Sequence, residues 1–168
     1  MEPDQQAHRD RANPPAIPDH TLLWPIGRGA YGEVWLSRNV MGALRAVKII
    51  WRRQFESDRP YKREFTGIQS YEPVSRSSGG LVHVLHVGRN EAEGYFYYVM
   101  ELADSADGSL NLETEVQAEM AAPSLKLEKY VPRTLRSDLK CISRLPTADC
   151  LRLALDVVSG LAQLHRHR

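Results

Sequence analysis

The sequence predicts an α+β fold, in which a five-stranded antiparallel sheet with one inserted helix is followed by two further helices. Residues 21–103 consist mainly of short apolar runs, rich in β-branched and aromatic residues and separated by turn residues. One stretch within them, beginning near Ser57, has helical spacing instead. A longer helical pattern occupies residues 147–166.

The first three strands are expected at residues 21–26, 33–38 and 44–51. Glycines separate the first two runs, and residues 39–42 supply a turn between the second and third. Short turns of this kind join neighbouring strands, so the three runs predict an antiparallel meander.

The inserted helix is predicted after the third strand. Ser57 is a suitable N-cap, and Tyr61, Phe65 and Ile68 recur at i, i+4 and i+7, which is the spacing of one helical face. Gly67 weakens this prediction, because glycine costs about 1 kcal/mol relative to alanine inside a helix.

Two more strands are predicted at residues 81–87 and 95–102. The acidic segment 104–129 has few aromatic residues and no clear period, so we interpret it as an insertion or surface loop. Helices follow at 134–142 and 147–166, and Thr147 is the expected N-cap of the second.

Composition excludes several classes of protein. The chain has 168 residues, 42% of them hydrophobic, and a formal net charge of +1, which gives no reason to expect nucleic acid or an anionic membrane as a partner. No run approaches the roughly 18 apolar residues of a membrane span. Residues 1–19 have no apolar core, so we expect a disordered tail rather than a signal peptide. Cys141 and Cys150 have no metal-type spacing and are interpreted as reduced cysteines of a cytoplasmic protein.

A G-x-G-x-x-G string is formed by Gly27, Gly29 and Gly32. In a dinucleotide-binding fold this string opens a helix, and an acidic residue follows about 20 positions later. Here a strand-like run follows Gly32, and position 52 is an arginine. The sequence therefore favours a flexible hairpin whose backbone N–H groups can approach phosphates. No G-x-x-x-x-G-K-[ST] string is present, which argues against a P-loop nucleoside triphosphatase.

Lys48 lies in the apolar third strand, where its charge must reach solvent or find a partner. An isolated strand lysine most often reaches solvent. Glu64, however, falls on the apolar stripe of the inserted helix, where a carboxylate is costly unless a cation meets it. The two residues are therefore predicted to form an ion pair.

In combination, these features resemble the N-lobe of a protein kinase domain: the glycine string, Val34 two residues later, Lys48 sixteen residues past Gly32, and Glu64 sixteen residues past Lys48. Residues 95–103 look like the fifth strand and hinge, which implies that Met100 is the gatekeeper. Residues 130–139 and 147–165 look like the first helices of the C-lobe, and their sequences are similar to those of bacterial Ser/Thr-type kinases.

The resemblance implies that the chain is the ATP-binding portion of such a kinase, with residues 20–103 as N-lobe and 130–168 as the start of a helical C-lobe. It implies that Lys48 contacts the α/β-phosphates and Glu64 supports it, that Tyr31 at the hairpin tip excludes water, and that backbone groups near Glu101 meet the adenine. The implied ATP-contacting residues are Ile26, Gly27, Gly29, Tyr31, Gly32, Val34, Ala46, Lys48, Met100, Glu101, Leu102 and Ala103.

In the family, the H-R-D and D-F-G strings that supply the catalytic base and hold Mg²⁺ come after the helix that here ends near His165, and neither string follows that helix in the sequence. We therefore expect a chain that is truncated before the catalytic loop and inactive alone, with Mg²⁺ and the protein substrate bound only by a complete kinase domain. The alternative is a pseudokinase-like nucleotide-binding or regulatory module. Because the 147–166 helix is apolar around much of its circumference, we also expect the chain to aggregate or to need a partner surface.

A basic cluster precedes and begins the inserted helix. A solvated face is the simpler interpretation, and a phosphorylated or nucleic-acid partner is the alternative. The cluster consists of Arg52, Arg53, Arg59, Lys62 and Arg63.

Overall fold

The computed structural model describes residues 14–108 and 130–167. Its elements, in chain order, are β1 (His20–Gly29), β2 (Gly32–Asn39), β3 (Leu44–Trp51), the short 3-10 helix η1 (Arg52–Gln54), α2 (Asp58–Ser75), β4 (Val84–Asn90), β5 (Tyr95–Met100), α4 (Leu135–Ile142) and α5 (Thr147–Arg166). The predicted α+β class, the five-stranded antiparallel sheet and the three α-helices are confirmed.

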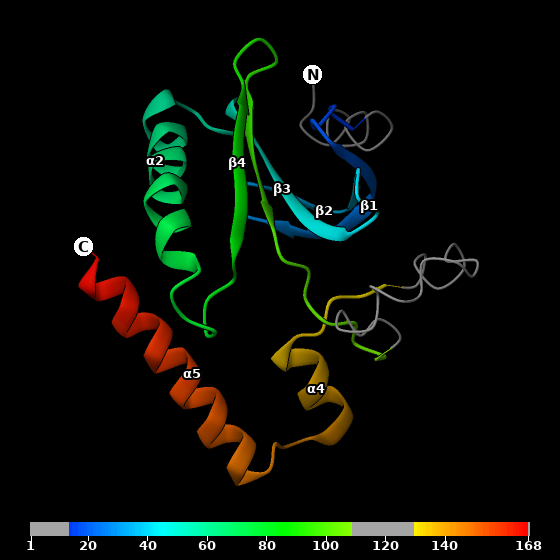
Figure 1. Ribbon diagram of the computed structural model, residues 1–168, viewed down its shortest axis with the longest axis vertical. Helices are drawn as coiled ribbons and strands as arrows, with labels where there is room; N and C mark the ends of the chain where they lie inside the picture. The colour runs from blue at the N-terminus through cyan, green and yellow to red at the C-terminus, as the bar shows by residue number, and fades with distance from the viewer. Residues whose placement is uncertain (1–13, 109–129, 168) are drawn as a thin grey trace.

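The strand order is β1-β2-β3-β5-β4, and every neighbouring pair is antiparallel. Only β4 and β5 depart from sequence order, because α2 carries the chain past the sheet before β4 begins at the edge. Figure 1 shows α2 standing alongside β4, with α4 and α5 beyond the end of the sheet.

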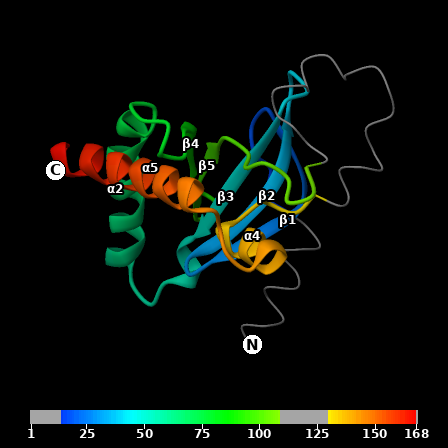
Figure 2. The same ribbon diagram turned by 90° about the horizontal axis from the view of Figure 1, so that it is seen from below.

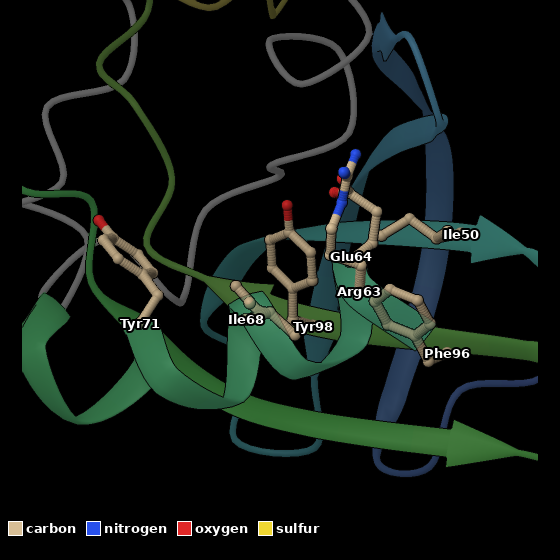
Figure 3. A pocket seen from close by; sticks show the side chains of 8 residues that line it. Ile50, Arg63, Glu64, Ile68, Tyr71, Phe96 and Tyr98 are labelled. Carbon is tan, nitrogen blue, oxygen red and sulfur yellow. The ribbon is translucent and has the colours of Figure 1, made fainter. Parts of the chain in front are cut away.

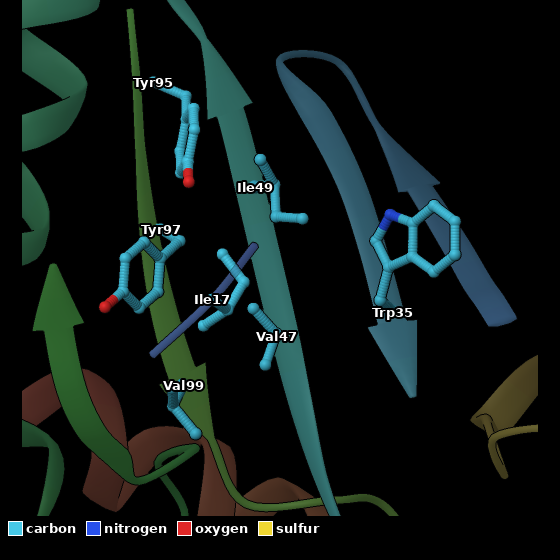
Figure 4. Packing of buried hydrophobic residues seen from close by; sticks show 7 residues of the cluster. All are labelled: Ile17, Trp35, Val47, Ile49, Tyr95, Tyr97 and Val99. Carbon is cyan, nitrogen blue, oxygen red and sulfur yellow. The ribbon is translucent and has the colours of Figure 1, made fainter. Parts of the chain in front are cut away.

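One face of the sheet, here called the outer face, is covered by the start of the described chain. Its buried cluster consists of Ile17, Trp35, Val47, Ile49, Tyr95, Tyr97 and Val99, and Figure 4 shows Ile17 lying across β3 and β5. Ile17 is only 5% exposed, and the Tyr95 hydroxyl donates to the Ala16 carbonyl at 2.9 Å. The predicted disordered tail therefore does not extend to residue 19. Burial of Ile17 orders residues 14–19, and the rest of that prediction lies outside the described residues.

The opposite face, here called the helix face, carries two clusters. Leu36, Leu44, Ala46, Leu102 and Tyr130 form the first. Ile50, Tyr61 and Phe96 form the second, to which Phe65 and Ile68 of α2 add. The predicted apolar stripe of α2 is thus the stripe that packs on the sheet.

Two of the differences between predicted and observed element boundaries have a local structural reason. Leu81 still belongs to the turn after α2, since its N–H donates to the Ser78 carbonyl, and β4 therefore begins later, at Val84. Thr147 is the first residue of α5 rather than its N-cap. The N-cap is Pro146, which offers no side-chain acceptor.

The helix α5 meets the rest of the fold at two glycines. A Cβ on Gly80 would lie 2.3 Å from the Asp156 carbonyl oxygen, and one on Gly160 would lie 3.2 Å from the Gly80 oxygen, so the two backbones are in close contact. Figure 2, which is seen from below, shows α5 crossing in front of α2. Several of its large apolar side chains are exposed, namely Leu151, Leu153, Leu155, Val157, Val158 and Leu161.

Residues on either side of the predicted acidic insertion are held together. Ser105 and Pro132 form an isolated antiparallel bridge, and the Ala106 N–H donates to the Val131 carbonyl at 2.8 Å. The segment 104–129 therefore leaves and rejoins the fold at one point. Positions 109–129 of that prediction lie outside the described residues.

Candidate functional site

Strand register brings the predicted site residues into neighbouring positions. Lys48 is paired with Val34 on β2 and with Tyr98 on β5, and Ala46 is paired with Met100. Side chains alternate along a strand, so Ala46 and Lys48 point to the same face as Ile50, which packs against α2. Lys48 therefore lies on the helix face, between the two apolar clusters.

The glycine string lies at a hairpin and not at a helix start. Gly29 and Gly32 are paired residues of β1 and β2, and they enclose the two-residue turn of Ala30 and Tyr31. A strand follows Gly32. This geometry contradicts the dinucleotide-binding alternative, which requires a helix at that position.

The fold requires glycine to a different degree at the three positions of the string. A Cβ on Gly32 would lie 2.2 Å from the Ile49 carbonyl oxygen, so the fold itself requires glycine there. At Gly27 and Gly29 the nearest atoms would be 3.8 Å away, an ordinary contact distance. Packing within this chain therefore leaves room for a side chain at Gly27 and Gly29.

That room faces the lysine. The atoms closest to a Cβ on Gly29 are Cε and Nζ of Lys48, both at 3.8 Å. Lys48 is half-buried, and its Nζ lies 5.6 Å from the centroid of the Tyr98 ring, within cation–π range. The hairpin backbone and an ammonium group thus border the same space, where an anion would meet both.

The predicted ion pair between Lys48 and Glu64 is not formed. Both side chains lie on the helix-face side, but in the described part of the chain neither makes an ion pair. The prediction assumed that both charges are buried. Each is only half-buried, so water can hydrate the carboxylate and the ammonium separately, and Lys48 has the Tyr98 ring as a cation–π partner.

Glu64 instead lines a cavity of about 330 Å³ between α2 and the sheet. The lining residues are Ile50, Arg63, Glu64, Gly67, Ile68, Tyr71, Phe96 and Tyr98. In Figure 3, Glu64 and the hydroxyl end of Tyr98 point to the same side of this cavity. The cavity therefore leaves open space between α2 and the strand that positions Lys48.

The apolar residues of the predicted adenine pocket do come together. Ile26, Val34 and Met100 pack against the cluster that contains Ala46 and Leu102. Sequence reasoning missed Tyr130, which is 4% exposed in the same cluster and whose hydroxyl donates to the Ala103 carbonyl at 2.8 Å. Burial, and secondarily the nearby Asp104 charge, raises the pKa of Tyr130 to about 12.

The segment after β5 is partly engaged by the protein. The Glu101 N–H donates to the His83 carbonyl at 3.1 Å, and the Glu101 side chain accepts from the His83 N–H at 2.9 Å. The Ala103 carbonyl is occupied by Tyr130. In the parts of the chain that the structure describes, the Glu101 carbonyl and the Ala103 N–H have no partner. One acceptor and one donor are thus available next to the apolar cluster.

The first two residues of the basic cluster, Arg52 and Arg53, lie on a solvated face. Arg52 donates from Nε to Asp58 at 2.7 Å, and the Arg53 guanidinium lies 3.8 Å from the Trp51 ring centroid. The Arg52 guanidinium holds the pKa of the Asp58 carboxyl below its usual value. Cys141 and Cys150 are free and exposed, on α4 and α5 respectively.

Residues 14–108 and 130–167 contain no metal-binding group and no membrane-spanning helix. No group of three or more histidine, cysteine or acidic side chains there is arranged to hold a metal ion. None of the described helices is both long and apolar enough to pass through a lipid bilayer. No protein-family model matches the chain, and no curated protein matches it.

Proposed function

We propose that this chain binds ATP as the nucleotide-binding portion of a Ser/Thr-type protein kinase. The observation that carries the proposal is the convergence on one sheet face of a glycine hairpin with room at Gly27 and Gly29, the Lys48 ammonium beside it, and an apolar cluster next to both. In a nucleoside triphosphate, the phosphates need backbone N–H groups and a cation, and the planar base needs an adjacent apolar pocket.

The triphosphate would lie between the hairpin and β3. Backbone N–H groups near Gly27 and Gly29 have no side chain to keep an anion away, and the Lys48 ammonium would neutralise its charge. Tyr31, which is 41% exposed at the hairpin tip, would cover the phosphates from water. Mg²⁺ belongs to the same proposal, but the described residues show no group that would hold it.

The adenine would occupy the apolar cluster of Ile26, Val34, Ala46 and Met100. An adenine ring presents an amino donor and a ring-nitrogen acceptor on its Watson–Crick edge. The unoccupied Glu101 carbonyl and Ala103 N–H have the complementary polarity, since one accepts and the other donates. These groups would orient the base, while the cluster shields its faces from water.

Phosphoryl transfer to a protein hydroxyl requires a catalytic base and metal-holding residues, and in the given sequence no H-R-D or D-F-G string follows α5, where the family places them. The activity proposed for the chain itself is therefore binding. A pseudokinase-like regulatory module is the second candidate, and the unpaired Lys48 and Glu64 favour it. The coding sequence beyond Arg168 separates the two, because an H-R-D-x-K-x-x-N string followed by D-x-G supports transfer.

The proposal is tested by titrating the chain with a fluorescent N-methylanthraniloyl derivative of ATP and with the same derivative of adenosine. Lys48→Met should weaken ATP binding about tenfold or more, because hydrogen bonds to charged groups are worth roughly 1.5–3 kcal/mol. Adenosine binding should be unchanged, since it has no phosphates.

Arg45→Met is the matched control for this experiment. Arg45 lies on the same strand, three residues away, and its position in the alternation places it on the outer face. The Arg45→Met variant should bind both probes with the affinity of the unaltered chain. Equal ATP affinity in Lys48→Met and Arg45→Met, or no binding by the unaltered chain, would contradict the proposal.

A further inference from the structure

A series of stacked and tilted rings joins the tip of the glycine hairpin to the sheet through the start of α2. Tyr31 stacks on Phe55 with ring centroids 5.0 Å apart and an interplanar angle of 17°. Phe55 then meets the edge of Tyr61 at 5.7 Å, and Tyr61 meets Phe96 at 5.2 Å. Phe55 is therefore the link between the hairpin and α2.

The register of the sheet explains why Phe55 is in reach. Glu33 pairs with Ile49, so the turn of Ala30 and Tyr31 lies level with the end of β3, where η1 begins. The chain leaves β3 through η1, and the Phe55 N–H donates to the Arg52 carbonyl at 3.1 Å, which fixes Phe55 directly after η1. The hairpin tip and Phe55 thus meet beyond the strand that carries Lys48.

We propose that Phe55 is a positioning residue of the nucleotide site, which holds the glycine hairpin over Lys48 through its stack with Tyr31. The inference rests on the proposed ATP-binding function and assigns to that site a residue outside the glycine string. Tyr31 is the large side chain of the exposed turn, and the stack with Phe55 anchors it. Holding a loop in place before a ligand arrives reduces the ordering cost of binding.

This arrangement predicts which part of the nucleotide senses Phe55. The hairpin turn borders the space beside Lys48, whereas the apolar cluster for the base is built from strand residues outside the turn, namely Ile26 of β1, Val34 of β2, Ala46 of β3 and Met100 of β5. Loss of the Phe55 ring should therefore affect binding of the triphosphate and leave binding of the nucleoside unchanged. A merely structural effect on the fold would lower both affinities together.

The experiment compares Phe55→Leu, Phe55→Tyr and the control His86→Leu in the full chain, with N-methylanthraniloyl derivatives of ATP and adenosine as probes. Phe55→Leu should weaken ATP binding about two- to tenfold, the factor to which the coupling of one aromatic pair converts, with no change for adenosine. Phe55→Tyr keeps the ring and should restore the affinity. His86→Leu removes a ring pair with Tyr97, at 5.9 Å, that is not part of the Tyr31–Phe55–Tyr61–Phe96 series, and should match the unaltered chain.

Tyr31→Leu provides a second route that does not disturb α2. If Phe55 acts through Tyr31, Phe55→Leu causes no further loss of ATP affinity in the Tyr31→Leu background. Additive losses, equal losses for ATP and adenosine, or an unaffected Phe55→Leu variant would each overturn the inference while leaving ATP binding in place. Failure of the unaltered chain to bind either probe would instead overturn the proposed function, and the inference with it.

Discussion

Replacing the three glycines of the hairpin one at a time by alanine separates what the fold needs from what a ligand needs. At Gly32 an added Cβ would lie 2.2 Å from the Ile49 carbonyl oxygen and 3.1 Å from the Ile50 Cγ1 atom. The strands must separate to admit it, and overpacking of this kind costs about 1–3 kcal/mol. Gly32→Ala should therefore lower the free energy of unfolding by about that amount, whether or not nucleotide is present.

At Gly27 and Gly29 we expect alanine to raise the free energy of unfolding rather than lower it. The nearest atoms to an added Cβ are 3.8 Å away, and neither residue has the positive φ that alanine avoids. Because alanine has less conformational freedom in the unfolded chain, each substitution should stabilise the fold by about 0.4–1 kcal/mol. Urea unfolding monitored by circular dichroism measures all three variants.

The ATP titration of the same variants completes the argument. The methyl group of Gly29→Ala would stand in the space between the hairpin and Lys48 Nζ, so phosphate binding should weaken about tenfold although the protein is more stable. A variant that gains stability and loses a ligand is not explained by damage to the fold. If Gly29→Ala binds ATP as well as the unaltered chain, the space beside Lys48 does not hold a phosphate.

Three further predictions concern stability. Gly67→Ala should raise the free energy of unfolding by about 0.5–1 kcal/mol in urea titrations, because its Cβ would meet nothing within 4 Å and alanine favours the helix; a loss would mean that α2 is packed differently at this point. Gly80→Ala should cost about 1–3 kcal/mol by the same measurement, since its Cβ would meet the Asp156 carbonyl at 2.3 Å, and an unchanged stability would show that α5 does not dock there. Tyr130 has a folded-state pKa of about 12, above the unfolded value near 10, so its contribution to the free energy of unfolding is present below pH 10 and is lost as pH rises toward 12. Urea unfolding between pH 9 and 12 should show this Tyr130 contribution being lost, up to about 2–3 kcal/mol, in the unaltered chain and not in Tyr130→Phe.

The fold could be predicted from the sequence where each pattern has one physical solution. The short alternating and apolar runs on either side of the inserted helix predict strands, and the stripe of Tyr61, Phe65 and Ile68 packs on the sheet as its spacing requires. The turn residues between β1, β2 and β3 leave the chain no length for a crossover, so an antiparallel meander follows.

Contacts between distant segments could not be predicted in the same way. Nothing local to Ile17 shows that it covers the outer face, because its burial depends on Tyr95 offering a hydroxyl to the adjacent carbonyl. The burial of Tyr130 could not be predicted from the sequence either, since the pairing of Ser105 with Pro132 brings Tyr130 to the helix-face cluster. In both cases one buried side chain from a segment without regular structure completes a cluster of the sheet.

The expected pair of Lys48 and Glu64 failed for an energetic reason that also bears on the site. The prediction treated two residues on apolar stripes as buried charges, but each keeps enough contact with water to be stable alone. The ammonium lies against the face of Tyr98, an attraction worth about 0.5–1 kcal/mol at a partly exposed position. A partner of that strength is readily displaced by a phosphate group.

An unpaired lysine is therefore compatible with a nucleotide site, and the arrangement around it indicates what would change when the site is filled. The cavity of about 330 Å³ lies between α2 and β5 on the side where Glu64 lies, beside the packed contact of Phe65 with Phe96. Phe55 and Tyr61 connect the start of that helix to the hairpin tip. A phosphate drawn toward Lys48 and the hairpin would thus bind at a hairpin whose tip is stacked on Phe55, which in turn packs on Tyr61 at the start of α2. On this argument, Glu64→Gln should alter ATP affinity less than Lys48→Met does, since the Lys48 ammonium borders the hairpin whereas Glu64 lines the cavity beside α2.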